Sequence, residues 1–110
     1  MHELSLTQGV IEICQNSSGG RRVTAVVLEV GELSSVVPEA LEFCFEACSK
    51  GTLLEGASLI IERIPARGKC HDCSKEFHLR SYYNSCPSCG GHQVTIISGE
   101  ELRVKEMEVD

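Results

Sequence analysis

Two stretches of the chain repeat apolar residues at the spacing of an amphipathic helix. In residues 4–16, apolar positions fall on one helical face and polar positions on the other. The Asn, Ser and Gly residues of 16–20 then end the pattern with turn chemistry. Residues 38–48 repeat the helical spacing with glutamates on the polar side. The sequence therefore predicts two helices, each with one face for burial.

The expected ends of the second helix rest on local residue chemistry. Ser34 and Ser35 stand just before it, and a serine hydroxyl is a good acceptor for helix N-terminal amides. Pro38 suits a first helical turn, because its missing N–H has no helical partner there. Gly51 follows the last apolar position and suits a helix end. We expect a serine cap, a proline start and a glycine stop.

Four segments have the composition of β-strands. Residues 22–30 are rich in β-branched side chains and apolar on both faces of the pleat, which is typical of a strand inside a covered sheet. Residues 58–64 form a second segment, which Pro65 ends. Residues 94–97 and 102–109 read as two more strands around a short turn. The last strand is too short to fold alone, so we expect it to rejoin the first sheet.

Between these strands lies a segment of a different kind. Apart from cysteine, residues 66–92 hold five apolar side chains: Ala66, Phe77, Leu79, Tyr82 and Tyr83. They also hold two CxxC pairs separated by twelve residues: Cys70, Cys73, Cys86 and Cys89. Two such turns can close a tetrahedral shell of four thiolates, which favours structural zinc over redox chemistry or an iron–sulfur centre. A closed shell leaves no open position for catalysis.

These patterns predict the fold class and the domain organisation. We expect an α+β fold, a small mixed sheet with two helices, interrupted by a zinc-ribbon-like module of four cysteines. Residues 1–65 and 93–110 would form the α/β domain, and residues 66–92 the zinc-binding module. The chain has 110 residues, which suits one compact domain with a small insertion.

Composition indicates the cellular compartment of the protein and the kinds of partner it can have. Seven cysteines, an odd number, fit a reducing compartment, and no basic region with an apolar core begins the chain. No apolar run approaches the roughly 18 residues that span a bilayer. We therefore expect a cytoplasmic protein without membrane contact, in which Cys14, Cys44 and Cys48 are small core residues. The net charge of −6 argues against general nucleic-acid binding.

Enzyme motifs are missing from the sequence. No GxSxG elbow occurs, and no cysteine stands in a recognisable nucleophile motif. The glycines at 51 and 56 have the spacing of a phosphate loop, but Ala57 and Ser58 replace the required Lys-Ser/Thr. We therefore predict that the protein is not an enzyme.

The first residues offer a compact set of nitrogen donors. His2 is too large for ready removal of the initiator methionine, so we expect Met1 to keep its α-amine. That amine, the His2 main-chain and ring nitrogens and the adjacent Glu3 amide can surround one ion in a plane. A nitrogen-rich planar set suits Ni(II) or Cu(II). The pattern alone is weak, because every chain that begins Met-His has it, and a frayed terminus is the plainer interpretation.

Three sequence features together resemble a known family. They are MHELSL at the start, VVLEVGELSSVVPEALEFCFEACSKGTLLEGASLIIE in the middle, and CHDC followed by CPSC. In combination they are similar to the HypA/HybF family of hydrogenase nickel-incorporation proteins, over essentially the whole chain. The resemblance implies a nickel metallochaperone that serves maturation of [NiFe]-hydrogenase.

The same resemblance implies partners and sites. The partners are the GTPase HypB and the large subunit of [NiFe]-hydrogenase, with other nickel-enzyme maturation factors, such as those of urease, in some organisms. Nickel would be carried as cargo by Met1, His2 and Glu3. The zinc ligands would be the four paired cysteines: Cys70, Cys73, Cys86 and Cys89.

Several alternatives stay open at this stage. His78 or His92 could reach the nickel ion, although surface histidines near a zinc turn are the simpler interpretation. Ser74 and Gly90 stand where some relatives carry a histidine after each CxxC, so a pH-dependent ligand exchange is not expected here. The alternative function is a zinc-ribbon module that binds protein or nucleic acid through basic residues of 63–80, with Tyr82 and Tyr83 for stacking. Strand exchange through the last strand leaves a homodimer open.

Overall fold

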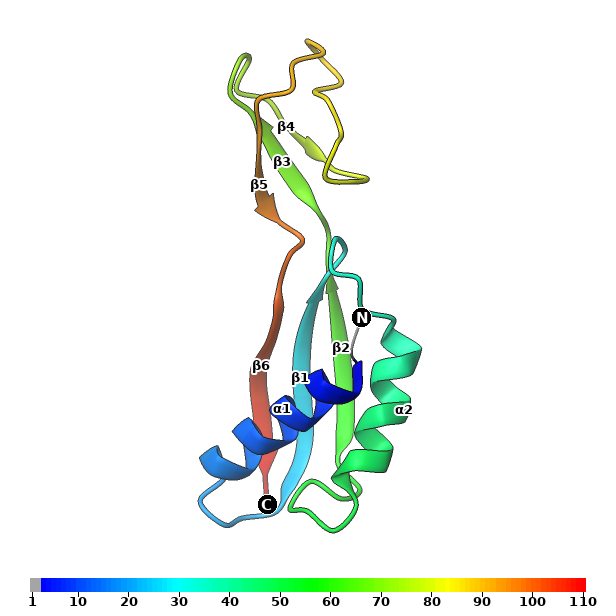
Figure 1. Cartoon of the computed structure of the whole chain (residues 1–110). Coiled ribbons are helices and arrows are strands. Elements are labelled where there is room, and N and C mark those ends of the chain that lie inside the picture. Colours follow the sequence, from blue (N-terminus) through cyan, green and yellow to red (C-terminus); the bar gives the residue numbers. More distant parts are fainter. Residues whose placement is uncertain (1–2) are drawn as a thin grey trace. The chain divides into compact units, whose positions relative to one another are not determined.

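The chain forms two compact units in the computed structural model, which describes residues 3–110. Unit 1 comprises the chain up to Glu29, Ser35–Glu62 and Arg103–Asp110. Unit 2 comprises Val30–Ser34 and Arg63–Leu102. Figure 1 traces the chain through both.

Unit 1 is built on a three-stranded sheet in the order β2-β1-β6. These strands are β1 (Val23–Gly31), β2 (Ser58–Ile64) and β6 (Leu102–Val109). The arrowheads of β1 and β2 point the same way and that of β6 the opposite way, so the sheet is mixed, as predicted (Figure 1). The β-branched strand is the central one, as predicted, but only one of its faces is fully covered: Val26, Leu28 and Val30 are buried, whereas Val27 and Glu29 are half-buried.

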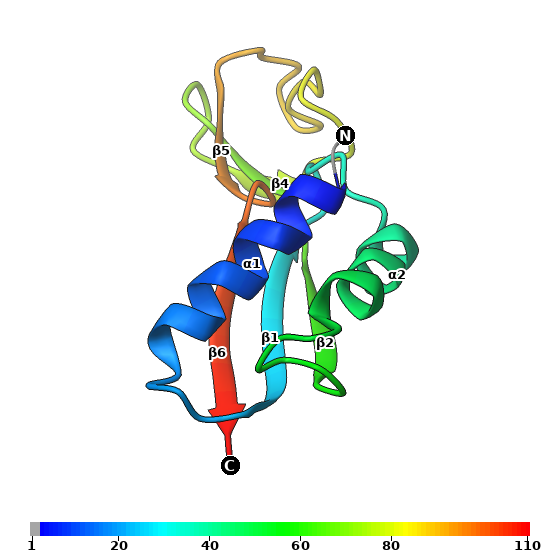
Figure 2. The same ribbon diagram turned by 60° about the horizontal axis from the view of Figure 1, so that its bottom comes forward.

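Two helices lie over one face of this sheet (Figure 2). Helix α1 spans Glu3–Ser17 and helix α2 spans Pro38–Ser49. The core between helices and sheet is formed by buried residues from both layers and the loop before β2: Ile11, Cys14, Val23, Val26, Phe45 and Leu54. Of the three helical cysteines, Cys14 is buried, and burial raises the pKa of its thiol; the others are half-buried.

Helix α2 begins differently from the prediction. Its N-cap is Val37, which has extended backbone and no capping side chain, and Pro38 is the first helical residue as expected. The serine cap was wrong, because the Ser34 hydroxyl instead donates to the Gly31 carbonyl at 2.8 Å. At the other end, Gly51 has a φ of 80°, a left-handed conformation that glycine adopts without strain.

Unit 2 contains a second three-stranded sheet, in the order β4-β3-β5. Its strands are β3 (Arg67–Cys70), β4 (Glu76–His78) and β5 (Val94–Ser98), and both pairings are antiparallel. The buried cluster of this unit is small: Ala66, Cys70, Phe77, Leu79 and Cys86. Two of these five residues are cysteines of the CxxC pairs, so the core and the cysteine cluster are one structure.

The units of the structure have different bounds from the two expected domains. The expected α/β domain includes residues 93–110, whereas β5 pairs with β3, with Val94 opposite Cys70. Residues 30–34 also belong to unit 2. Among the helices that the structure describes, none is long and apolar enough to cross a membrane.

Candidate metal centre

The four cysteines of the CxxC pairs come together in unit 2. Cys70 ends β3 and Cys73 lies in the turn that follows, while Cys86 and Cys89 lie in a second turn before β5. All four sulfur atoms lie within 4.8 Å of one another. Cys70 Sγ is 3.6 Å from Cys89 Sγ, and Cys73 Sγ is 3.6 Å from Cys86 Sγ. Each close pair of sulfur atoms therefore joins one cysteine of the first turn to one cysteine of the second.

The two turns have the same backbone hydrogen bonds. Cys70 accepts from the Ser74 N–H at 2.8 Å, and Cys86 accepts from the Gly90 N–H at 2.8 Å. The Cys70 N–H donates to the Lys75 carbonyl, and the Cys86 N–H to the Gly91 carbonyl, each at 2.9 Å. In both turns the residue after the second cysteine is left-handed, with φ of 63° at Ser74 and 75° at Gly90. The two CxxC segments are therefore two copies of one local structure.

The spacing of the sulfurs fits a tetrahedral metal ion. A disulfide needs an S–S distance of about 2.05 Å, and all four thiols are free at 3.6 Å or more. A zinc–thiolate bond of about 2.3 Å in a tetrahedron separates neighbouring sulfurs by about 3.8 Å. Cys70 and Cys86 are buried and Cys73 and Cys89 exposed, so the cluster lies at the surface of unit 2 with one side covered. The donor set and its geometry fit structural zinc.

Backbone amides act on the thiols of the second turn. The N–H of Cys89 lowers the pKa of the Cys86 thiol, whereas desolvation raises it. The N–H of Ser88 lowers it further, and the pKa of Cys86 falls to about 7. At Cys89 the N–H of Gly91 lowers the pKa of the thiol. The hydrogen bond shared with the Cys70 thiol, desolvation and the thiols of Cys86 and Cys73 act in the opposite direction, and the pKa of Cys89 is raised to about 12. The Cys86 thiol thus loses its proton more readily than the Cys89 thiol. A divalent cation would replace the remaining protons.

Two of the three histidines of unit 2, His71 and His78, have partners outside the cysteine cluster. The His71 ring is hydrogen-bonded to the Thr95 hydroxyl, and His78 Nε2 lies 2.7 Å from Glu32 Oε1. His92 is exposed and borders a hollow beside Tyr82 and Tyr83. Among the described residues, the cysteines form the one group of three or more potential ligands.

The predicted nickel site lies mostly beyond what the structure describes. Met1 and His2 are outside the described residues. Glu3 is the first residue of α1, and its carboxylate accepts the N–H of Val37, the cap of α2, at 3.3 Å. Its carbonyl accepts the Thr7 hydroxyl. The Glu3 side chain therefore connects the starts of both helices.

Comparison with known proteins decides the family. The family model "Hydrogenase/urease nickel incorporation, metallochaperone, hypA" matches residues 1–109. The chain belongs to the HypA family. It is 63% identical over 110 residues to the hydrogenase maturation factor HypA of Geobacter metallireducens, covering 100% of each chain. It is 46% identical to the HypA of Trichodesmium erythraeum, covering 100% of this chain and 96% of that one.

A solved HypA structure has the same fold. The solution structure of the Ni metallochaperone HypA from Helicobacter pylori superposes with a TM-score of 0.69 at 26% identity, covering 99% of this chain and 97% of that one. The resemblance seen in the sequence is thereby confirmed. HypA proteins are metallochaperones and maturation factors, which agrees with the prediction that this chain is not an enzyme.

Sequence reasoning missed two residues of unit 2. Glu32 lies in a connecting segment far along the chain from His78, and no local pattern links the two. Ser74 has a left-handed backbone conformation, which a sequence ordinarily indicates only where it has a glycine. The signal for Ser74 was present, because Gly90 holds the equivalent place in the second turn.

Proposed function

We propose that this HypA chain binds Ni(II) as cargo through its first three residues and delivers it for maturation of [NiFe]-hydrogenase. The observation that carries the proposal is the family match, which spans residues 1–109 and so includes the Met-His-Glu start. The receiving partner would be the hydrogenase large subunit, with the GTPase HypB assisting the transfer. The seven free cysteines support a reducing, cytoplasmic setting.

The proposed nickel donors are nitrogens of consecutive residues. They are the Met1 amine, the His2 main-chain and ring nitrogens and the Glu3 amide nitrogen, which can lie in one plane around Ni(II). Glu3 begins α1, and a helix does not use its first amides in its own hydrogen-bond ladder. Metal binding at that nitrogen would therefore cost no helical hydrogen bond. His78 or His92 as a further donor remains a separate option.

We assign the cysteine cluster to zinc. Zinc bound by Cys70, Cys73, Cys86 and Cys89 would hold the two turns together, and with four protein ligands it would have a structural role. Under this assignment unit 1 carries the nickel site and unit 2 the zinc site. Chelation that removes zinc would then affect the cysteine turns first.

A nickel titration tests the proposal. Tag-free, zinc-loaded protein is titrated with Ni(II) by calorimetry and visible absorption, beside His2→Ala and a variant with one glycine inserted after Met1. We expect one nickel per chain with square-planar absorption, lost in His2→Ala and lost or altered by the insertion, with zinc content unchanged. The variant His92→Ala tests the separate option of a further donor: nickel binding equal to that of the parent would exclude His92 as a ligand.

Two outcomes would contradict the assignment. Equal nickel binding by the parent, His2→Ala and the insertion variant would move the ion to another place on the chain. No nickel binding by the parent would favour the alternative function, a zinc-ribbon module that binds protein or nucleic acid. Salt-dependent binding of nucleic acid by the zinc-loaded chain would then support that alternative.

A further inference from the structure

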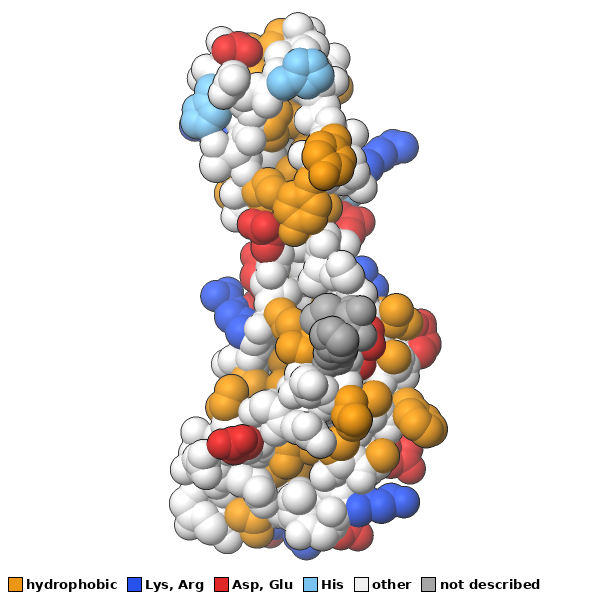
Figure 3. All heavy atoms as spheres, viewed as in Figure 1, with side chains coloured by type: hydrophobic (Ala, Val, Ile, Leu, Met, Phe, Trp, Pro, Cys, Tyr) orange, Lys and Arg blue, Asp and Glu red, His pale blue; other side chains and the backbone are white. Residues whose placement is uncertain are grey.

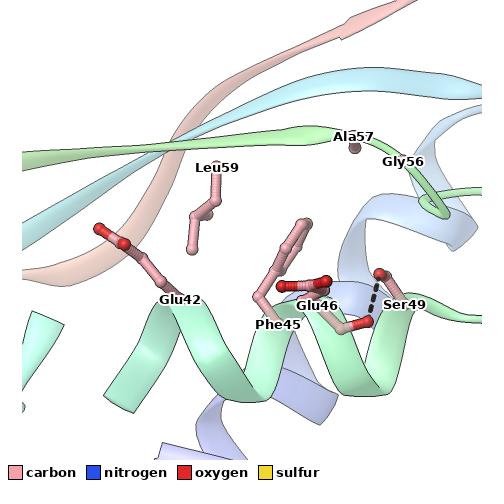
Figure 4. A pocket seen from close by; sticks show the side chains of 7 residues that line it. All are labelled: Glu42, Phe45, Glu46, Ser49, Gly56, Ala57 and Leu59. Atoms are coloured by element: carbon pink, nitrogen blue, oxygen red, sulfur yellow. Dashed lines mark hydrogen bonds between the residues drawn. The ribbon is translucent and has the colours of Figure 1, made fainter. Parts of the chain in front are cut away.

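Unit 1 contains a cavity at the edge of its sheet, between α2 and the segment that enters β2. Its volume is about 420 Å³. Figure 4 shows the lining residues, which come from two successive turns of α2 and from the start of β2: Glu42, Phe45, Glu46, Ser49, Gly56, Ala57 and Leu59. β2 is an edge strand of the three-stranded sheet, so this side of the cavity has no further strand beyond it.

The inner wall of the cavity is apolar. Phe45 is 3% exposed and belongs to the core of unit 1, and Leu59 packs against the same cluster while remaining half-buried. Figure 4 shows the Leu59 and Phe45 side chains side by side above α2. These side chains would contact the alkyl part of a ligand, which would remove apolar surface of the ligand and of the half-buried Leu59 from water.

Two carboxylates border this apolar wall. Glu42 and Glu46 project from α2 with Phe45 and Leu59 between them (Figure 4). Among residues 3–110 neither has an ion pair or a side-chain hydrogen bond. The Ser49 hydroxyl does not serve them, because it donates to the Glu46 carbonyl at 3.1 Å.

Two glutamates on the sheet of unit 1 have a cationic partner within the fold. Glu29 receives a hydrogen bond from Arg103 Nε at 2.5 Å, and Glu62 pairs with Lys105 Nζ at 3.1 Å. Glu42 and Glu46, by comparison, have no cation beside them among the described residues. A cation from outside would complete the arrangement.

We propose that the cavity binds an arginine side chain presented by a partner polypeptide. Residues four apart on a helix face the same side, with Cβ atoms about 5–6 Å apart, and a guanidinium has five N–H donors that can serve two carboxylates at once. Its three methylene groups would lie on Leu59 and Phe45. A lysine ammonium is a compact, strongly hydrated charge without this planar fork and fits the pair of carboxylates less well.

The surface next to the cavity favours a polypeptide over a small cation. Phe43, one residue beyond Glu42 on α2, is 75% exposed. Figure 3 shows acidic and apolar side chains interspersed over this helix. An arginine flanked by apolar residues could place its neighbours on Phe43. The inference concerns unit 1 alone and does not depend on the nickel or zinc assignments.

Peptide titration followed by NMR tests the proposal on the full, zinc-loaded chain. The probe is the blocked tripeptide Ac-Leu-Arg-Leu-NH₂, and its control contains citrulline, which has the same shape without the charge. We expect saturable shifts at the amides of Gly56, Ala57 and Leu59. Binding should be at least about fivefold weaker for the citrulline peptide and should weaken as salt is raised.

Matched variants decide whether the cavity itself is responsible. Glu42→Gln and Glu46→Gln should each weaken binding of the arginine peptide by about three- to tenfold, because each removes one carboxylate from the cavity. Glu39→Gln removes the same charge from the same helix without lining the cavity, and it should change the affinity less than twofold. All three residues are exposed, so the variants should keep the parent spectrum elsewhere.

Several outcomes would overturn the proposal. They are no saturable shift with the arginine peptide, equal binding of the citrulline peptide, or equal weakening by Glu39→Gln. Spermidine that produces the same shifts at equal affinity would show a general cation site. Shifts at these amides that depend on protein concentration alone would make the occupant a second copy of the chain.

Discussion

Glu32 and His78, 46 residues apart in the sequence, meet through a hydrogen bond of 2.7 Å between Glu32 Oε1 and His78 Nε2. The same carboxylate oxygen accepts the N–H of Ala66 at 2.9 Å. Glu32 therefore holds its segment, Val30–Ser34, to the start of the second sheet and to β4 within unit 2. The Ala66 N–H, with His78 adding to it, lowers the pKa of the Glu32 carboxyl below its usual range.

This lowered pKa predicts an acid-dependent contribution to stability. A carboxyl whose pKa is lower in the folded than in the unfolded chain stabilises the fold above its unfolded pKa, about 4.3, and loses that effect as the pH falls through the folded pKa. We expect Glu32→Gln to lower the free energy of unfolding near pH 6. The gap to the parent should begin to narrow as the pH falls below about 4.3, and it should close as the pH passes through the lowered pKa of the folded chain, where the parent carboxyl is protonated too.

Urea unfolding of both proteins at each pH measures that gap, with bound zinc determined in the same samples, and only pH values at which both proteins retain zinc are compared. Glu76→Gln, an exposed carboxylate on β4, is the matched control for lost charge. A gap that stays constant as the pH falls below about 4.3 in samples that retain zinc, or one as large for Glu76→Gln, would contradict the role given to Glu32.

The strands and helices of unit 1 could largely be predicted, because their patterns are long and periodic. The predicted strands 58–64 and 102–109 are confirmed as β2 and β6 with the same bounds. Pro38 marked the start of α2 correctly. The serine cap failed because Ser34 bonds back to Gly31 in the preceding turn, and a side chain's choice of backbone partner depends on the loop's conformation.

Unit 2 was harder to predict because its structure depends on contacts distant in sequence. β3 contains Gly68 and Lys69 and has no apolar alternation, and β4 has three residues, so neither carries a local strand signal. The CxxC spacing nevertheless predicted which four cysteines would meet. The pairing of Glu32 with His78 could not be predicted, because it arises from how the segments fold together.

Ser74 predicts a way to stabilise the metal-binding turn. It has a φ of 63°, where a side chain costs about 1–2 kcal/mol relative to the ordinary helical region. Ser74→Gly should raise the free energy of unfolding of the zinc-loaded protein by about 1 kcal/mol, after allowance for glycine's extra freedom in the unfolded chain. Tyrosine fluorescence during guanidinium unfolding would report it, since the chain has no Trp and both Tyr residues lie in unit 2.

The equivalent position in the second turn provides the reverse test. Gly90 has a φ of 75°, and a Cβ there would meet nothing within 4 Å. Gly90→Ser should therefore destabilise by a similar amount through backbone strain alone. If Ser74→Gly destabilises, or Gly90→Ser has no effect, backbone conformation is not what distinguishes the two turns.

Removal of zinc should affect the two units differently. Cys70 and Cys86 are two of the five buried residues in the core of unit 2, whereas the core of unit 1 contains no member of the cysteine cluster. Structural zinc contributes about 10–16 kcal/mol in small zinc-binding folds. After chelation, amide hydrogen exchange should become fast across residues 66–92 while the amides of β1 and α1 stay protected.

The chelated sample needs a control for general loss of structure. Zinc added back should restore protection in residues 66–92, and Cys73→Ser should imitate chelation without any chelator present. Full protection of residues 66–92 in the metal-free chain would mean that the small core holds unit 2 together by itself.

A close approach of two backbones in unit 2 should make Gly31 intolerant of any side chain. A Cβ on Gly31 would lie 2.1 Å from the Gly99 carbonyl oxygen and 2.6 Å from the Glu101 nitrogen. Both contacts are to backbone, which cannot rotate away as a side chain can. The segment is also held by two hydrogen bonds, from the Gly31 N–H to the Glu101 carbonyl at 2.6 Å and from the Leu33 N–H to the Gly99 carbonyl at 2.8 Å.

Gly31→Ala should therefore lower the free energy of unfolding by about 2 kcal/mol or more, because the backbones must separate and both hydrogen bonds weaken. Gly9→Ala is the matched control: it adds the same methyl group inside α1, where a Cβ would meet nothing within 4 Å. Since alanine favours a helix over glycine, Gly9→Ala should stabilise by about 0.5–1 kcal/mol. Urea unfolding of the two variants would show changes of opposite sign. If Gly31→Ala were as stable as the parent, the two backbones could not lie this close in solution.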